Sequence, residues 1–348
     1  MIFNLENLVR ENIKRLTPYS SARSEFSGAA QIYLDANENS FGSPLGENYH
    51  RYPDPLQTEI KRVISDRQNV ETDQIFLGNG SDEAIDLLFR IFCEPRSDNV
   101  LICPPTYGMY AVSAAINAVE TKRAALTKDF RLDFQAIENQ IDARTKLLFI
   151  CSPNNPTGNS FPREEILQLI ESFGGIVVVD EAYIHFSRSE SLVSEINRFR
   201  NLVVLQTFSK AWGLAGARVG LAFAAAETIA LFNRVKPPYN ISQPAQEAIL
   251  RAFGSSAKVE ETIAEIVSER EKLIEKLSEI SRVEKIYPTD ANFVLVKTAE
   301  AEKIYRFLLD EKIVVRDRSR VELCAGCLRI TVGTPEENES LLRALKKL

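Results

Sequence analysis

The stretch Thr207-Phe208-Ser209-Lys210-Ala211-Trp212-Gly213-Leu214-Ala215-Gly216-Ala217-Arg218-Val219-Gly220 places one lysine in a turn rich in glycine. Apolar runs flank this turn on both sides and are typical of buried strands. A lysine held there by the fold loses its proton more readily than one in water, and its amine can then form an imine with an aldehyde. Ser209 and Arg218 could hold a phosphate beside it. The pattern indicates pyridoxal 5′-phosphate (PLP), an aldehyde that carries a phosphate, although a lone lysine is more simply a surface residue in a loop.

Length and composition set the class of protein. The 348 residues fit about two domains, and 45% hydrophobic with 26% charged residues is ordinary for a soluble globular chain. The net charge of -6 and the pI near 5.4 argue against nucleic acid or an anionic membrane as the main partner. No signal peptide is visible at the start, and no apolar run approaches transmembrane length. We therefore expect a cytoplasmic protein.

The cysteines and histidines are too few and too scattered to indicate a metal site. Cys324 and Cys327 have the spacing of a redox or metal pair, but no second such pair exists among the five cysteines. His50 and His185 are the only histidines and lie far apart in sequence. We expect reduced thiols, no metal, and no mechanism that depends on histidine.

From about residue 75 to 224, apolar strands alternate with amphipathic helices, which predicts an α/β domain with a mostly parallel sheet. Ligands of open α/β sheets bind outside the carboxyl ends of the strands. Five residues stand at such ends, and we expect them to share one site: Gly80, Tyr107, Asn155, Asp180 and Lys210.

The turn Gly80-Ser81-Asp82 joins a predicted strand at 74–77 to a helix that runs through Phe92. Unpaired amides of a first helical turn bind anions, so this turn is a candidate phosphate site. The glycines do not complete the dinucleotide pattern G-x-G-x-x-G, which disfavours NAD. Taken alone, the turn could also be a plain capped helix.

The remainder of the chain predicts a smaller α+β domain. A long charged helix at about 257–280 precedes it, and its strands are predicted at 292–297, 313–316 and 327–332. We expect a large PLP-binding domain over 41–250, with 1–40 and 251–348 forming an N-terminal arm and the small substrate-side domain. Two arginines, Arg316 and Arg329, lie in the last two of these strands. Each could form a salt bridge with an internal carboxylate or bind a substrate anion.

Several motifs occur in the order found in one enzyme family. The chain resembles fold-type I PLP-dependent aminotransferases over essentially its whole length, and within them the histidinol-phosphate aminotransferases. The motifs are Leu-Thr-Pro-Tyr (16–19), Leu-Asp-Ala-Asn-Glu-Asn (34–39), Arg-Tyr-Pro-Asp (51–54), Gly-Ser-Asp-Glu (80–83), Cys-Pro-Pro-Thr-Tyr-Gly-Met-Tyr (103–110), Ser-Pro-Asn-Asn-Pro-Thr-Gly (152–158), Val-Asp-Glu-Ala-Tyr (179–183), Thr-Phe-Ser-Lys-Ala (207–211) and Leu-Arg-Ile-Thr-Val-Gly (328–333).

This resemblance implies the fold and the roles around the cofactor ring. The large domain would hold a mostly parallel sheet of seven strands between layers of helices. Lys210 would be the Schiff-base lysine and proton shuttle, and Asp180 would pair with the pyridine nitrogen. Asn155 and Tyr183 would hydrogen-bond the phenolic oxygen of the ring, and Tyr107 would stack on its face.

The resemblance also implies how the phosphate of PLP and a second subunit meet. Tyr52 would reach the cofactor phosphate of the neighbouring subunit, so a homodimer is expected. Within one subunit the phosphate would be held by the backbone around Gly80, Ser81 and Asp82, and by Ser209 and Arg218.

For the substrate, the resemblance places Arg316 and Arg329 on its anionic groups, with Tyr19, Asn37 and Asn155 nearby. The implied reaction is transamination of L-histidinol phosphate with 2-oxoglutarate, which gives imidazole-acetol phosphate and L-glutamate in histidine biosynthesis. An aromatic aminotransferase and a threonine-phosphate decarboxylase of the same fold are the alternatives. A PLP-binding regulator fused to a DNA-binding module is disfavoured, because no basic helix-turn-helix is present in the chain.

Overall fold

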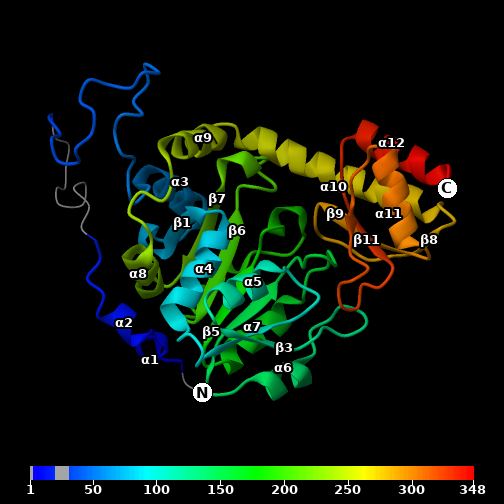
Figure 1. Cartoon of the computed structure of the whole chain (residues 1–348), viewed down its shortest axis with the longest axis horizontal. Helices are drawn as coiled ribbons and strands as arrows, with labels where there is room; N and C mark the ends of the chain where they lie inside the picture. The colour runs from blue at the N-terminus through cyan, green and yellow to red at the C-terminus, as the bar shows by residue number, and fades with distance from the viewer. Residues whose placement is uncertain (1–2, 20–30) are drawn as a thin grey trace.

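The computed structural model describes residues 3–19 and 31–348, and Figure 1 shows a large sheet wrapped by helices with a smaller sheet beside it. The large sheet has the order β1-β7-β6-β5-β4-β2-β3, and only β7 runs antiparallel to its neighbours. The predicted mostly parallel seven-stranded sheet is therefore confirmed. Its strands are β1 (Ile75–Asn79), β2 (Asn99–Ile102), β3 (Glu120–Arg123), β4 (Thr145–Cys151), β5 (Ile176–Asp180), β6 (Leu202–Thr207) and β7 (Val219–Ala224).

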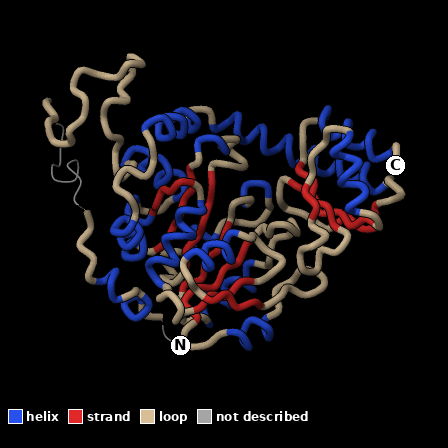
Figure 2. The backbone as a smooth tube through the Cα atoms, in the orientation of Figure 1, coloured by secondary structure: helices blue, strands red, loops and turns tan. Residues whose placement is uncertain are grey.

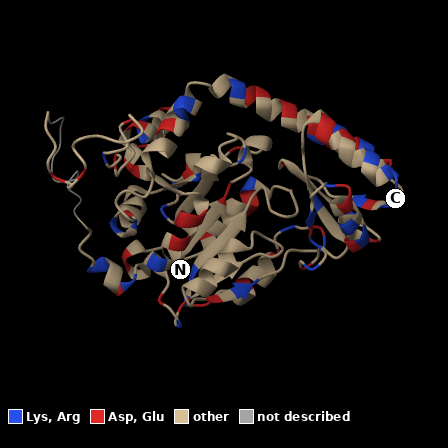
Figure 3. Cartoon of the chain, turned by 45° about the horizontal axis from the view of Figure 1, so that its top comes forward, with Lys and Arg blue, Asp and Glu red and all other residues tan. Residues whose placement is uncertain are grey.

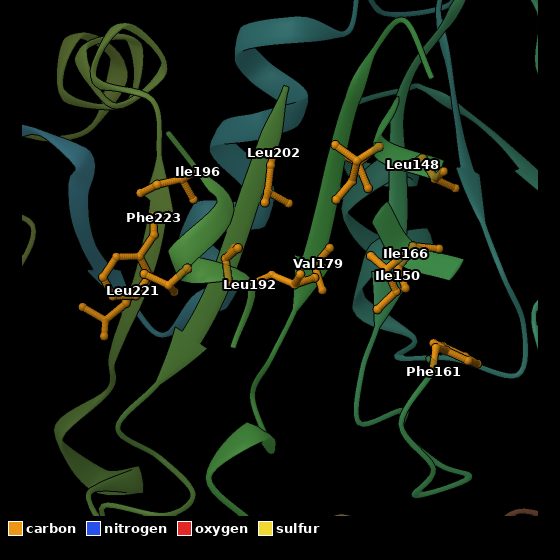
Figure 4. Packing of buried hydrophobic residues seen from close by; sticks show 14 of the residues in the cluster. Leu148, Ile150, Phe161, Ile166, Val179, Leu192, Ile196, Leu202, Leu221 and Phe223 are labelled. Carbon is orange, nitrogen blue, oxygen red and sulfur yellow. The ribbon is translucent and has the colours of Figure 1, made fainter. Parts of the chain in front are cut away.

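Alternate residues of these strands build two separate cores, one on each face of the sheet. Val177 and Val179 belong to one cluster while Val178 between them belongs to the other, as the two-residue period of a strand requires. Figure 2 shows the strands enclosed by helices, and Figure 4 shows Ile150 and Val179 close to Ile166. One face is covered by α3 (Thr58–Gln68), α6 (Phe134–Gln140), α7 (Arg163–Ser172) and α9 (Gln243–Phe253), the other by α4 (Ser81–Phe92), α5 (Met109–Ile116) and α8 (Ala226–Val235).

The second sheet is antiparallel and has the order β10-β11-β9-β8. One face packs against α11 (Ala301–Asp310) and α12 (Pro335–Lys346) in a third apolar cluster, which confirms the predicted α+β character. Its strands are β8 (Val283–Ile286), β9 (Phe293–Thr298), β10 (Arg316–Asp317) and β11 (Cys327–Thr331).

The helix α10 (Ser256–Ser278) connects the two sheets, and Figure 3 shows both acidic and basic residues along it. Its last turns enter the small core through Leu273 and Leu277. Arg270 donates hydrogen bonds to the carbonyl oxygens of Phe186 at 3.2 Å and Ala291 at 2.9 Å. One buried guanidinium therefore links the helix to both halves of the chain.

The N-terminal helices α1 (Leu5–Leu8) and α2 (Glu11–Lys14) pack on the large sheet, where Val9 and Ile13 join the cluster of α4. Irregular chain follows, and in Figure 1 the blue segment after the grey trace extends away from the body. Part of the predicted arm 1–40 lies outside the described residues. The division into domains stays a prediction.

Two edge strands and one boundary differ from the sequence-based expectation. The edge strands β3 and β8 carry charged, partly exposed residues, so no apolar run marks them. The strand predicted at 313–316 is paired only at Arg316 and Asp317, and the preceding Val314 is 75% exposed.

None of the helices in the described part of the chain combines the length and the apolar composition of a membrane span. Among the same residues, no group of three metal-ligating side chains lies together.

Candidate active site

One cavity opens at the carboxyl ends of the central strands and collects most of the predicted site. Ten of the fifteen predicted residues line it, and the remaining five are described below. The lining residues are Gly80, Ser81, Asp82, Tyr107, Cys151, Asn155, Asp180, Ala182, Tyr183, Thr207, Ser209, Lys210 and Arg218. Five strands and their turns thus converge on one point, as the strand-end argument predicts.

Lys210 lies in the turn after β6 and faces this cavity. Its Nζ is 5.6 Å from the centre of the Tyr183 ring. Partial burial lowers the pKa of Lys210, whose side chain keeps some access to solvent. The positive charges of Arg329 and Arg218 lower it further, and Asp180 opposes them. No carboxylate of the described residues pairs with it within 4.0 Å. The amine is therefore suited to act as a nucleophile and base.

Asp180 ends β5 and is 3% exposed. Its Oδ2 accepts a hydrogen bond from the Tyr110 hydroxyl at 2.7 Å, and its Oδ1 accepts one from the Ala182 amide at 3.1 Å. Burial nevertheless raises the pKa of Asp180. A buried carboxylate of this kind favours a cationic partner, such as a protonated ring nitrogen.

Tyr110 is the functional residue that sequence reasoning missed. It is fully buried on α5, and its ring stacks on Phe149 at 4.7 Å between centroids. The quoted motif 103–110 ends on this residue, but nothing in the spacing shows that its hydroxyl meets Asp180. That contact depends on how α5 packs on the sheet.

Asn155 connects the cavity to the small sheet. Its side-chain amide donates to the Tyr183 hydroxyl at 3.4 Å, and its Oδ1 accepts from Arg329 Nη1 at 2.5 Å. The Arg329 guanidinium also lies 5.1 Å from the centre of the Phe293 ring. Arg329 therefore reaches from β11 to the edge of the cavity, although it does not line it.

The turn before α4 forms a cradle of the kind that binds phosphate. Gly80 has φ +72°, and a Cβ there would come within 2.7 Å of Arg218 Nη2. Asp82 accepts from the Tyr107 hydroxyl at 3.0 Å and lies 3.6 Å from Arg218. Ser81 and Asp82 of the first turn of α4 line the same cavity as Arg218, and groups of these kinds stabilise an anion.

The other four predicted residues lie apart from the cavity in this single chain. Tyr52 stacks on Tyr239 with centroids 4.4 Å apart and is 50% exposed. Arg316 on β10 lies opposite Arg329 on β11 in the backbone register of the small sheet. Tyr19 and Asn37 are exposed. Their predicted roles stay predictions.

Comparison with known proteins gives the class. Residues 32–345 match the model of the family "Aminotransferase class I and II". The chain belongs to this family.

Two relatives and one solved structure are similar to the chain over most of its length. The histidinol-phosphate aminotransferase of Cytophaga hutchinsonii is 49% identical over 346 residues, with 99% of each chain covered. That of Parabacteroides distasonis is 50% identical over 345 residues, again with 99% of each chain covered. The crystal structure of histidinol-phosphate aminotransferase from Clostridium acetobutylicum superposes with a TM-score of 0.79 at 28% identity, covering 86% of this chain and 91% of that one.

Proposed function

We propose that the protein is a PLP-dependent transaminase that exchanges an amino group between L-histidinol phosphate and 2-oxoglutarate. The observation that carries this proposal is the single cavity in which Lys210, Asp180 and the Gly80 cradle face one another. Full-length relatives that are about half identical to the chain and bear the name histidinol-phosphate aminotransferase support the substrate.

The residues of the cavity fit PLP in charge and position. The Gly80 cradle with Arg218 and Ser209 would hold the phosphate, and Tyr107 lies beside it at the cavity wall. Burial raises the pKa of Asp180 despite the nearby charge of Lys210, and a protonated pyridine nitrogen in direct contact would stabilise its ionised form. Asn155 and Tyr183 would hold the phenolic oxygen.

When bound, PLP serves as an electron sink for the bonding electrons released at the substrate carbon. The chain supplies orientation and proton transfer. Lys210 holds the cofactor and moves the proton, because its lowered pKa keeps a larger share of the amine neutral. Asp180 keeps the ring nitrogen protonated, and Tyr110 holds that carboxylate in place through its hydroxyl.

Both substrates would present an anion to the arginines of the small sheet. Arg329 is already oriented toward the cavity by Asn155, and Arg316 lies opposite it in register. A guanidinium accepts phosphate or carboxylate through two parallel hydrogen bonds. One anion site could therefore serve histidinol phosphate and glutamate in turn, with Tyr19 and Asn37 proposed to close it.

We propose a homodimer in which Tyr52 reaches the partner's phosphate cradle. Nine of the exposed large apolar side chains in the described residues lie between 16 and 56: Leu16, Tyr19, Ile32, Leu34, Phe41, Leu45, Tyr49, Tyr52 and Leu56. Such a concentration of exposed apolar groups indicates a protein interface, and a second copy is the occupant proposed here. A cytoplasmic location stays a prediction that cell fractionation can test.

The proposal is tested by turnover together with the visible spectrum. Purified protein with PLP should absorb in the visible range, and L-histidinol phosphate should change that spectrum and yield glutamate from 2-oxoglutarate. Lys210→Ala should lose both signals while its circular dichroism stays that of the wild type.

Two outcomes would point to the alternatives. Faster turnover of aromatic amino acids than of histidinol phosphate would indicate an aromatic aminotransferase. Carbon dioxide released from threonine phosphate would indicate a decarboxylase.

A further inference from the structure

The small sheet turns one face toward the cavity, and that face carries three arginines. On β11, Leu328 and Ile330 belong to the core under α11 and α12, so Cys327 and Arg329 occupy the opposite face. Arg316 pairs with Arg329 in register. The amide of Arg318 continues the ladder with a 2.9 Å bond to the Cys327 carbonyl oxygen, which places Arg318 two residues beyond Arg316 on that same face.

The three guanidinium groups are close enough to affect one another. Burial is the main cause of the lowered pKa of Arg318 and of Arg329. The positive charge of Arg316 lowers the pKa of Arg318 further, and the charges of Arg318 and Arg316 lower that of Arg329 further. Burial raises the pKa of Tyr183, which lines the cavity, and the positive charges of Arg329 and Arg318 oppose that rise. Three like charges are therefore gathered beside the site where the substrate is proposed to bind.

The acidic side chains of the described residues offset this cluster only through longer-range charge, such as that of Asp317 on Arg318. Arg316, Arg318 and Arg329 form no ion pair within 4.0 Å among residues 3–19 and 31–348. The buried Nε atoms of Arg318 and Arg329 also lack a hydrogen-bond acceptor. Neighbouring like charges with unsatisfied donors are costly, and a bound anion removes that cost.

We propose that Arg318 is a third anion-binding residue, which makes the site selective for a dianionic phosphate over a carboxylate. This inference rests on the proposed function and adds the basis on which its two substrates are told apart. A phosphate monoester carries three acceptor oxygens and nearly two negative charges at pH 7, whereas a carboxylate has two oxygens and one charge. Arg316 and Arg329 can bind either group. Arg318 binds the second negative charge, which only the phosphate carries.

The test is Arg318→Gln, with Arg320→Gln as the matched control. Arg320 is exposed and two residues further along, so its loss removes the same charge without the same position. We expect Arg318→Gln to raise the KM for L-histidinol phosphate about tenfold, the scale of one charge-assisted hydrogen bond, and the KM for glutamate less than about twofold. Arg320→Gln should leave both constants within about twofold of wild type.

A second readout uses inorganic phosphate as a competitive inhibitor, with succinate for comparison. The second pKa of phosphate is about 6 to 7, so inhibition of the wild type should strengthen as the pH rises through that range. Arg318→Gln should weaken inhibition by phosphate and flatten this pH dependence, with inhibition by succinate unchanged. Arg318→Lys keeps the charge and should retain part of the preference.

Equal changes for both substrates, or no change for either, would overturn the role of Arg318. These results differ from a failure of the proposed function. In that case the wild-type protein itself would not turn over histidinol phosphate, whatever residue 318 is. Thermal melting of each variant separates lost binding from lost folding.

Discussion

At the scale of single residues, cations from both halves of the chain influence one cavity. Lys210 comes from the large sheet and Arg329 from the small one, yet burial and the charge of Arg329 are the two leading causes of the lowered Lys210 pKa. The carboxylate of Asp180 acts in the opposite direction. The neutral fraction of the amine at a given pH therefore depends on both halves of the chain.

Arg329→Gln tests this coupling. Because the charge of Arg329 lowers the pKa of Lys210, its removal should raise that pKa and keep more of the amine protonated at neutral pH. We expect the pH midpoint for acetylation of Lys210 by acetic anhydride, measured by mass spectrometry on protein without PLP, to move upward. Arg343→Gln removes an exposed arginine of α12 and should leave the midpoint in place. A midpoint unchanged in both variants would disprove the coupling.

Asp180→Asn should separate stability from activity. Burial raises the pKa of Asp180 above its usual value, so folding disfavours its ionised form, and stability is lost as the pH rises from about 3.8 through the folded-state pKa. The amide cannot ionise, so the cofactor-free variant should melt no lower than the wild type at pH 7. Turnover should fall roughly 10²-fold or more, since the ring nitrogen loses its counter-ion.

The control for that experiment is Asp129→Asn, which changes an exposed carboxylate. It should alter neither the melting temperature nor turnover. A large fall in the melting temperature of Asp180→Asn alone would show that the carboxylate is held mainly for structure.

At this scale the sequence predicted which residues belong to the site better than it predicted the contacts that their side chains make. Lys210, Asp180 and Asn155 could be assigned to one site because each follows a strand that apolar residues mark clearly. Tyr110 could not, because its hydroxyl meets Asp180 only through the packing of α5 on the sheet. Arg318 likewise gains its position from a ladder bond to β11.

At the scale of elements, the close approach of β7 to the start of α4 shapes the phosphate cradle. A Cβ on Gly220 would come within 2.1 Å of the Ser81 amide nitrogen and 2.3 Å of the Gly80 carbonyl carbon. Both atoms belong to the backbone, so they cannot rotate away as a side chain would. The strand can approach so closely only because this residue is glycine.

Gly220→Ala should therefore displace the cradle while the sheet still forms. We expect the affinity for PLP, followed by the visible absorbance, to fall about tenfold or more, and stability to fall by about 1–3 kcal/mol. Gly216→Ala is the matched control, because nothing lies within 4 Å of a Cβ there. Equal PLP affinities in the two variants would contradict the cradle assignment.

The elements were predicted where apolar residues mark them and missed where they do not. The all-buried strands β5 and β6 follow continuous apolar runs, and α7 buries Ile166, Leu169 and Ile170 at the spacing of one helix face. The strands β3 and β8 lie at sheet edges and carry lysine, which keeps an edge from pairing further but removes the apolar signal.

At the scale of the whole molecule, one chain does not bring every predicted residue together. Tyr52 stacks on Tyr239 of its own chain, and the segment before it extends away from the body in Figure 1. The roles predicted for Tyr19 and Asn37 depend on that segment too. No spacing within a sequence encodes what a second copy would cover.

Mixing two inactive variants tests the shared site. Tyr52→Ala and Lys210→Ala should each lose most activity, since each would remove one residue from every site of the proposed homodimer. After subunit exchange, half of the dimers would be mixed and each would contain one intact site, so activity should return to about a quarter of wild type. Absence of any recovery, with mixed dimers present by mass spectrometry, would place both residues in one subunit's site.

Asn155 also determines whether the Arg329 side chain loses its conformational entropy during folding or during substrate binding. An arginine side chain that becomes fixed loses up to about 2 kcal/mol of rotational freedom. Asn155 Oδ1 already fixes Arg329 at 2.5 Å in the folded chain, so that loss accompanies folding and does not recur each time a substrate arrives. In the proposed ping-pong turnover two substrates would enter the same site in succession, and an arginine held in advance would spare both of them the same entropic penalty.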